Sequence, residues 1–141
     1  MKILVLCTGN SCRSQMAEAF LRSFDRNIEV FSAGTDPARQ VHPWAIQVMS
    51  ELGISLKGHT PKNVALFVDE DFDFVITVCG EANETCPSFL GKVNKRLHAG
   101  FEDPAKATGS EEQILAVFRK VRDEIREWFY RFYSEQIRTI P

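Results

Sequence analysis

The segment Cys7-Thr-Gly-Asn-Ser-Cys-Arg13-Ser14 holds a cysteine and an arginine separated by five residues. It lies between an apolar run and a helical pattern, so its backbone N–H groups are predicted to converge on one anion beside the positive end of the helix dipole. Arg13 adds a planar fork that fits two oxygens of a tetrahedral oxyanion. The predicted oxyanion-binding residues are Thr8, Gly9, Asn10, Ser11, Cys12, Arg13 and Ser14.

Cys7 stands at the start of this loop and is predicted to be a nucleophile. The donors that attract an anion also favour a thiolate, and the Ser14 hydroxyl is a further potential donor, so we expect a depressed pKa for the Cys7 thiol. The alternative is that Cys7 is a small buried apolar residue at a strand end. The Cys–Arg spacing between a strand and a helix favours the nucleophile.

Cys79 and Cys86 form a second pair of candidate thiols. Cys79 follows a predicted strand, and Cys86 comes seven residues later, after a polar connection. A thiol bound to an oxidising oxyanion can be attacked by a second thiol, and a third can take over the resulting disulfide. Two alternatives are incidental thiols and a zinc site, although the usual zinc-ligand spacing is missing.

Composition limits the classes of protein that this chain can be. Its 141 residues fit one domain spanning 1–141, and 44% hydrophobic with 26% charged residues is typical of a globular protein. A formal net charge of -2 provides no basic field for nucleic acid. The apolar run 3–7 is too short to span a membrane, and no signal peptide is recognisable. We therefore expect a cytoplasmic monomer, in which cysteines serve catalysis, redox chemistry or metal binding.

Strands and helices are predicted to alternate along the chain. This pattern predicts an α/β fold with three layers, in which helices flank a four-stranded parallel sheet and ligands bind at the carboxyl ends of the strands. Cys7 and Cys79 fall at such ends. Ser110 and Gln113 predict a capping box. The predicted strands are 2–6, 29–33, 74–78 and 96–101; the predicted helices are 14–24, 43–52, 60–68 and 110–133, and 134–141 is expected to fray.

Residues Cys7 to Glu18, with Phe101-Glu-Asp-Pro104, resemble the low-molecular-weight protein tyrosine phosphatase superfamily, and most closely its thioredoxin-coupled arsenate reductases. The resemblance runs from Lys2 to about Arg126. Phosphatases of this group typically carry proline where this chain has Gln15. The segment Val78 to Pro87 resembles the redox segment of the reductases. The family fold is a four-stranded parallel sheet between helices.

The resemblance implies an arsenate reductase. Arsenate, with phosphate or sulfate as competing anions, would bind the 7–14 loop, and Cys7 would attack arsenic. A Cys7–Cys79 disulfide and then a Cys79–Cys86 disulfide would follow. Thioredoxin is the implied reductant, a low-molecular-weight thiol is the alternative, and neither a cofactor nor a metal is implied. Cys12 is not one of the three redox cysteines in the family, so local packing is its expected role.

Asp103 occupies the position of the family's general acid, although an Asp before Pro also commonly caps a turn. Phosphatases usually place an aromatic residue after Asp-Pro, whereas Ala105 here favours a small inorganic substrate. A phosphatase that uses Cys7, Arg13 and Asp103 alone is therefore an alternative function. A non-catalytic thiol sensor or metal-binding module is another.

Asn10, Glu18 and Ser32 match positions that help some arsenate reductases to bind potassium. Lys62 stands where another ligand in that site is acidic. Because a lysine ammonium repels a cation, we expect no required potassium ion. The alternative is that these residues simply brace the loop and the first helix.

Overall fold

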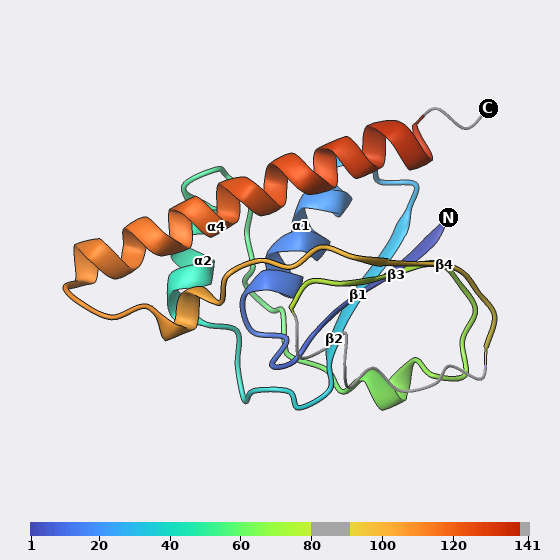
Figure 1. Cartoon of the computed structure of the whole chain (residues 1–141), viewed down its shortest axis with the longest axis horizontal. Helices are drawn as coiled ribbons and strands as arrows, with labels where there is room; N and C mark the ends of the chain where they lie inside the picture. The colour runs from blue at the N-terminus through green and yellow to red at the C-terminus, as the bar shows by residue number, and fades with distance from the viewer. Residues whose placement is uncertain (80–90, 139–141) are drawn as a thin grey trace.

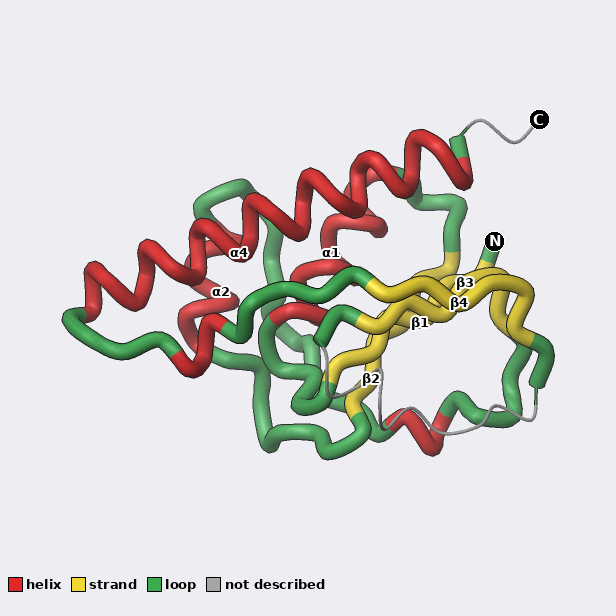
Figure 2. Tube along the Cα trace, in the orientation of Figure 1, coloured by secondary structure: helices red, strands yellow, loops and turns green. Residues whose placement is uncertain are grey.

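The computed structural model describes residues 1–79 and 91–138, and in these ranges four parallel strands form one sheet. The strand order is β2-β1-β3-β4, so β1, which leads into the candidate oxyanion loop, lies inside the sheet (Figures 1 and 2). The predicted α/β fold with a four-stranded parallel sheet is confirmed. The strands are β1 (Lys2–Cys7), β2 (Glu29–Gly34), β3 (Phe72–Thr77) and β4 (Val93–His98).

The prediction for the fourth strand was wrong by three residues. The sequence predicted a strand over 96–101, but β4 covers 93–98. Its residues 94–96 are polar and exposed because β4 is an edge strand with one neighbour, β3. An exposed edge has no need of a continuous apolar run, so the sequence pattern placed the strand too late.

Three α-helices pack against one face of the sheet (Figure 1). They are α1 (Arg13–Phe24), α2 (Pro43–Ser50) and α4 (Glu111–Phe132). The predicted capping box at the start of α4 is confirmed, because the Ser110 and Gln113 side chains each bond the other residue's backbone N–H. Phe118 and Phe129 of α4 are fully buried in the core between the helices and the sheet.

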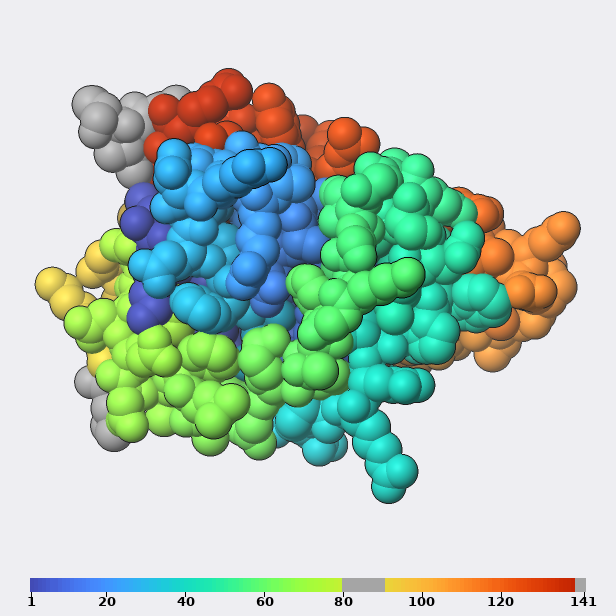
Figure 3. Space-filling view, turned by 180° about the vertical axis from the view of Figure 1, so that it is seen from behind, coloured from blue at the N-terminus to red at the C-terminus, as the bar shows by residue number. Residues whose placement is uncertain are grey.

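In the described ranges, the other face of the sheet is covered by the chain around η1 (Val64–Leu66). Val64 and Phe67 pack against Leu4 and Leu6 of β1. Seen from behind, the green to yellow-green segment lies against blue residues of the N-terminal part of the chain (Figure 3). The predicted 60–68 helix is thus a single 3-10 turn. The backbone at residues 62 and 63 pairs with β2 and with Asn10, which prevents an earlier helical start.

The prediction that 134–141 frays was wrong for its first part. A π-helical turn, η3 (Tyr133–Ile137), continues α4, and both of its end residues are buried. The Tyr133 hydroxyl donates to Asp25 Oδ2 at 3.1 Å, which fastens this turn to the end of α1. Of the helices in the described part of the chain, none is long and apolar enough to cross a membrane.

Candidate active site

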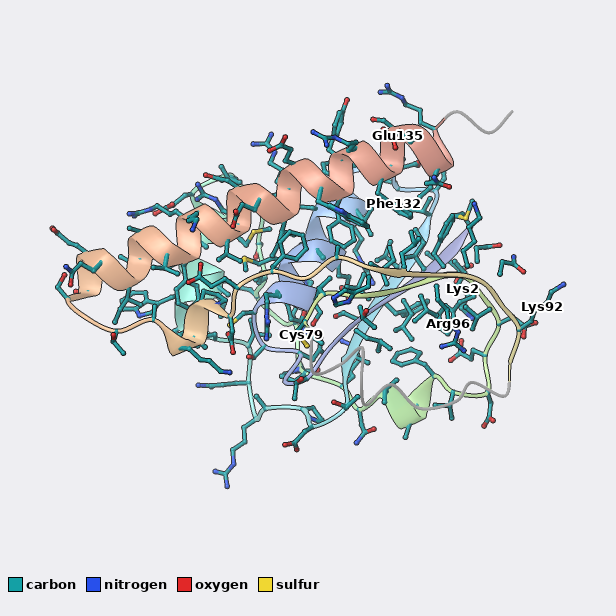
Figure 4. All side chains as sticks on the ribbon, in the orientation of Figure 1. Lys2, Cys79, Lys92, Arg96, Phe132 and Glu135 are labelled. Atoms are coloured by element: carbon teal, nitrogen blue, oxygen red, sulfur yellow. The ribbon has the colours of Figure 1, made fainter. Side chains whose placement is uncertain are left out.

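The candidate site lies where β1 and β3 end and α1 begins. Cys7 is the last residue of β1, Arg13 is the first residue of α1, and Cys79 follows β3 by two residues. Figure 4 shows Cys79 beside the start of α1. Its Sγ atom is 3.3 Å from Thr8 Oγ1, so the parallel sheet joins two segments that are 71 residues apart. Cys7 and Cys79, both predicted at strand ends, therefore lie together at the carboxyl end of the sheet.

The loop that connects β1 to α1, residues 7–14, is called the anion loop here. Its carbonyls are held from outside by backbone N–H groups of residues 35–42, which we call the belt. A peptide's carbonyl and the next residue's N–H point in opposite directions, so carbonyls held outward turn the following N–H groups inward. The four bonds run from Thr35 to Cys7 (3.2 Å), Asp36 to Thr8 (2.9 Å), Ala38 to Gly9 (2.9 Å) and His42 to Ser11 (2.9 Å).

Asn10 is the residue that bends the anion loop. Its φ of 51° lies in the left-handed region, a conformation that Asn tolerates better than most side chains do. The side chain is fully buried, and its Nδ2 donates to Ser14 Oγ (2.7 Å) and Ser32 Oγ (3.0 Å). Its Oδ1 accepts from the Lys62 backbone N–H at 2.9 Å. The left-handed position in this loop is therefore Asn10 and not its neighbour Gly9.

Gly34 allows the belt to approach the anion loop. A Cβ atom at Gly34 would lie 2.4 Å from the Thr8 carbonyl oxygen and 3.1 Å from the Asn10 nitrogen. Real Cβ atoms do not come this close to backbone atoms. The end of β2 must therefore lack a side chain, and this requirement concerns the loop's shape rather than β2 itself.

Arg13 is buried and is held at the edge of the anion loop. One guanidinium nitrogen donates to the Phe101 carbonyl (3.1 Å), and another lies 3.6 Å from Asp103 Oδ2. The Arg13 Nε atom is buried and has no hydrogen-bond partner among the described residues. A buried donor without an acceptor is costly, so this nitrogen marks a place where a bound oxyanion would be stabilised.

The expectation of a depressed pKa for Cys7 was wrong for the arrangement seen here. Contact with the Cys79 thiol and burial both raise the pKa of Cys7, whereas Arg13 and the Thr8 N–H lower it only in part. The effect of Cys79, 72 residues away in sequence, on the pKa of Cys7 is therefore larger than that of the nearby donors. Burial also raises the pKa of Cys12, to about 12, which agrees with a packing role for this residue at the start of α1.

Asp103 lies at the start of η2 (Pro104–Lys106), across from the anion loop. Its Oδ1 accepts from the Ala105 backbone N–H at 3.0 Å, so it caps this turn, while its Oδ2 faces Arg13. The capping interpretation and the site interpretation are thus compatible. Cys86, the remaining predicted site residue, lies outside the described residues.

Several residues that support the site have only weak sequence signals. Gln15 is fully buried and bonds the Asn10 backbone, and His59 contacts Gln15 at 3.2 Å and the Glu18 carboxylate at 3.7 Å. His42 accepts from the Trp44 N–H and packs on Phe118, and burial lowers its pKa. A buried polar residue cannot be recognised from one sequence. From the sequence, Gln15, His42 and His59 were therefore assigned no role at the site.

Asn10, Glu18 and Ser32, which match the potassium-binding positions of some arsenate reductases, lie together. Ser32 Oγ donates to Glu18 Oε1 at 2.8 Å and accepts from Asn10. Lys62 Nζ donates to the Thr60 carbonyl at 3.0 Å beside this group. Within residues 1–79 and 91–138, no cluster of three or more His, Cys, Asp or Glu side chains is arranged to hold a metal.

Proteins of known family resemble the chain over most of its length. The family model of low molecular weight phosphotyrosine protein phosphatases matches residues 2–139. The chain belongs to this family, as its fold and its cysteine–arginine loop indicate.

Within the family, the chain groups with proteins named arsenate reductase. One from Shouchella clausii (strain KSM-K16) is 46% identical over 124 residues, which span 87% of this chain and 88% of the relative. A solved arsenate reductase in the phosphate binding state is 35% identical with a TM-score of 0.80, covering 95% of this chain and 97% of that one. A thioredoxin-dependent arsenate reductase of Corynebacterium glutamicum is 28% identical with a TM-score of 0.63, covering 96% of this chain and 63% of that one.

Proposed function

We propose that this enzyme reduces arsenate to arsenite through a thiol adduct and a disulfide cascade. One observation carries the proposal: the thiols of Cys7 and Cys79 contact each other beside an oxyanion loop whose Arg13 Nε has no hydrogen-bond partner in the described part of the chain. Hydrolysis of a phosphate ester needs only one thiol, that of Cys7. A second thiol within reach of the first is what a reductase needs.

In the first step, the Cys7 thiolate attacks arsenic and forms a sulfur–arsenic bond. The inward N–H groups of the anion loop and Arg13 stabilise the oxyanion. Asp103 gives a proton to the departing oxygen, which leaves as water. Binding of arsenate would place the substrate between Arg13 and Asp103, which lie 3.6 Å apart here. Loss of one water molecule accompanies the new bond.

In the second step, the Cys79 thiolate attacks Cys7 Sγ. The sulfur–arsenic bond breaks and its electron pair stays on arsenic, which goes from As(V) to As(III) and leaves as arsenite. Two thiols are oxidised to the Cys7–Cys79 disulfide, so two electrons are lost and two are gained. The contact between these thiols means that the sheet need not rearrange for the attack.

In the third step, the Cys86 thiolate attacks Cys79 Sγ and Cys7 leaves as a thiolate. The Cys79–Cys86 disulfide is then reduced by thioredoxin, a role supported by the thioredoxin-dependent relative. Such a cycle requires free thiols, which a reducing compartment maintains, so we place the enzyme in the cytoplasm. A comparison of turnover with thioredoxin and with glutathione as sole reductant tests this step.

The cascade is tested by counting thiols. Reduced protein, which has four cysteines, is exposed to arsenate without reductant, alkylated and weighed by intact-mass spectrometry. We expect two alkylatable thiols to disappear, with peptide mapping to Cys79 and Cys86. Survival of all four thiols would contradict the cascade.

Two variants separate the steps of the cascade. Cys7→Ser should form no adduct and lose no thiol. Cys86→Ser should stop at the Cys7–Cys79 disulfide, so that peptide mapping finds those two residues joined and turnover ceases. Normal steady-state turnover in either variant would refute the scheme.

A second activity, hydrolysis of an aryl phosphate, is favoured by the family match itself. Cys7, Arg13 and Asp103 suffice for it, because a phosphoenzyme needs a nucleophile, an oxyanion clamp and an acid. Cys79→Ser distinguishes the two activities. It should abolish arsenate reduction and leave the hydrolysis of an aryl phosphate intact, and equal loss of both would argue against independent use of Cys79.

A further inference from the structure

The belt does not hold the carbonyl at the bend of the anion loop. Backbone N–H groups of the belt hold the carbonyls of residues 7, 8, 9 and 11, and the Met16 N–H of α1 holds that of Cys12. Between them, the Asn10 carbonyl lies at the left-handed bend, and it accepts from the Gln15 side-chain Nε2 at 3.2 Å. One side chain of α1 thus supplies the donor that the belt lacks.

The surroundings of Gln15 fix the direction of its amide. Gln15 is fully buried, and its Oε1 lies 3.2 Å from His59 Nδ1, which can donate to it. This contact leaves the Nε2 group to face Asn10, where it approaches both the backbone carbonyl and Oδ1 at 3.2 Å. The same group also reaches the Thr60 carbonyl at 3.2 Å. Gln15 therefore has a donor face directed at the bend of the loop.

We propose that Gln15 is a positioning residue that aims the Ser11 N–H into the oxyanion site. The Asn10 carbonyl and the Ser11 N–H belong to one trans peptide, so holding the first outward turns the second inward. Without Gln15, this peptide has no partner from the belt, and its plane is free to rotate about the bend. The proposal rests on the proposed function only in that the loop binds a tetrahedral oxyanion.

The test uses inorganic phosphate as the probe and amide NMR as the readout. A phosphate titration of the wild-type enzyme gives a Kd and a shift of the Ser11 amide signal. In Gln15→Leu, which has similar volume and no donor, we expect Kd to rise about 2- to 12-fold, the range for one net hydrogen bond. The phosphate-induced shift should shrink at Ser11 more than at Thr8, because the belt still holds the carbonyl that precedes Thr8.

Ser23→Ala is the matched control. Ser23 lies on the same helix, and within residues 1–79 and 91–138 its hydroxyl bonds the Phe20 carbonyl alone, at 2.7 Å, so its loss should leave Kd and the Ser11 shift unchanged. Gln15→Met is a second variant that keeps a flexible side chain in the buried space, and it should behave as Gln15→Leu.

Three results would overturn the proposal. They are an unchanged Kd in folded Gln15→Leu, an equal loss of response at Ser11 and Thr8, and failure of both Gln15 variants to fold. Phosphate binding involves no thiol oxidation, so the titration does not require the disulfide cascade. The experiment therefore remains decisive for Gln15 even if the thiol count shows that the enzyme does not reduce arsenate.

Discussion

The two sides of the candidate site are built in different ways. The anion loop is held by four belt bonds, by the Asn10 side chain and by Gln15. On the opposite side, the polar contacts that the described residues show between the 101–103 segment and the loop are both made by Arg13, one hydrogen bond of 3.1 Å and one ion pair of 3.6 Å. The first side is extensively braced, and the second is lightly attached.

This difference corresponds to what each side must do. Donors that stabilise an oxyanion are effective only if they already point at it, so an extensively braced loop suits binding. In the proposed mechanism Asp103 is the acid, so it must release its proton and exchange its contact with Arg13 for one with substrate. A single ion pair of 3.6 Å is readily replaced. The contrast predicts that changes on the acid side affect rate and that changes on the loop side affect oxyanion affinity.

Among the variants that keep Cys7 and Cys79, Asp103→Asn should cause the largest loss of reaction rate. General-acid catalysis typically contributes about 10²- to 10⁴-fold, so the rate of adduct formation should fall by roughly 10²-fold or more. Phosphate affinity should change much less. Rapid-quench measurement of arsenate-dependent thiol loss gives the rate. Glu102→Gln, a neighbouring exposed carboxylate 3.7 Å from Lys120, is the control, and a wild-type rate in Asp103→Asn would remove Asp103 from the mechanism.

Gly34→Ala should damage the braced side instead. The new Cβ would lie 2.4 Å from the Thr8 carbonyl oxygen, so the belt and the loop must separate. We expect a loss of about 1–3 kcal/mol in the free energy of unfolding, which is typical of overpacking, and a higher Kd for phosphate. Gly9→Ala is the matched variant, because its Cβ would meet only Ser11 Oγ, at 3.6 Å. Equal effects in both variants would show that close approach at Gly34 is unimportant.

The parts of this molecule that the sequence predicted correctly depend on neighbours in the chain. β1 is a buried apolar run, α4 keeps a helical apolar period behind its Ser110 cap, and the anion loop consists of contiguous residues. Because a strand, a loop and a helix follow one another there, the placement of Cys7 and Arg13 could be expected from local reasoning.

The parts that were missed depend on distant contacts. Belt donors are backbone N–H groups, which every residue except proline has, so no residue type reveals them. The pKa of Cys7 is raised mainly by Cys79, which a different strand brings to it. The edge strand β4 was misplaced for a related reason, since its polar half pairs with β3 without being buried. Such features become visible only when the sheet is assembled.

Cys79→Ala should make Cys7, which lies on the braced side of the site, more reactive. Contact with the Cys79 thiol is the largest cause that raises the pKa of Cys7, so its removal should lower that pKa and raise the thiolate fraction at neutral pH. A shift of one pKa unit would speed alkylation of Cys7 about 10-fold below its pKa. The measurement is the iodoacetamide rate at Cys7 against pH, by peptide mass spectrometry. A midpoint at higher pH than in the wild type would contradict this cause.

Glu51→Gln should have the smallest effect, and it tests whether scaffold stability and oxyanion binding can be separated. Glu51 joins α2 to α4 through Arg119 and Arg122, with contacts of 2.7 and 2.8 Å, and these arginines lower its pKa from 4.5 to about 2. Because the folded-state pKa is the lower one, the stabilisation is present above about pH 4.5 and is lost as pH falls towards 2.

Urea unfolding should therefore show Glu51→Gln less stable than wild type by about 1 kcal/mol at pH 7, with the difference vanishing in acid. Glu127→Gln removes a more exposed pair with Arg131 and should cost less. Phosphate Kd should stay at the wild-type value, because the arginine clamp lies outside the anion loop and the belt. A weaker phosphate affinity in Glu51→Gln would mean that the α2–α4 clamp also shapes the loop, through the His42 bond to Ser11 that precedes α2.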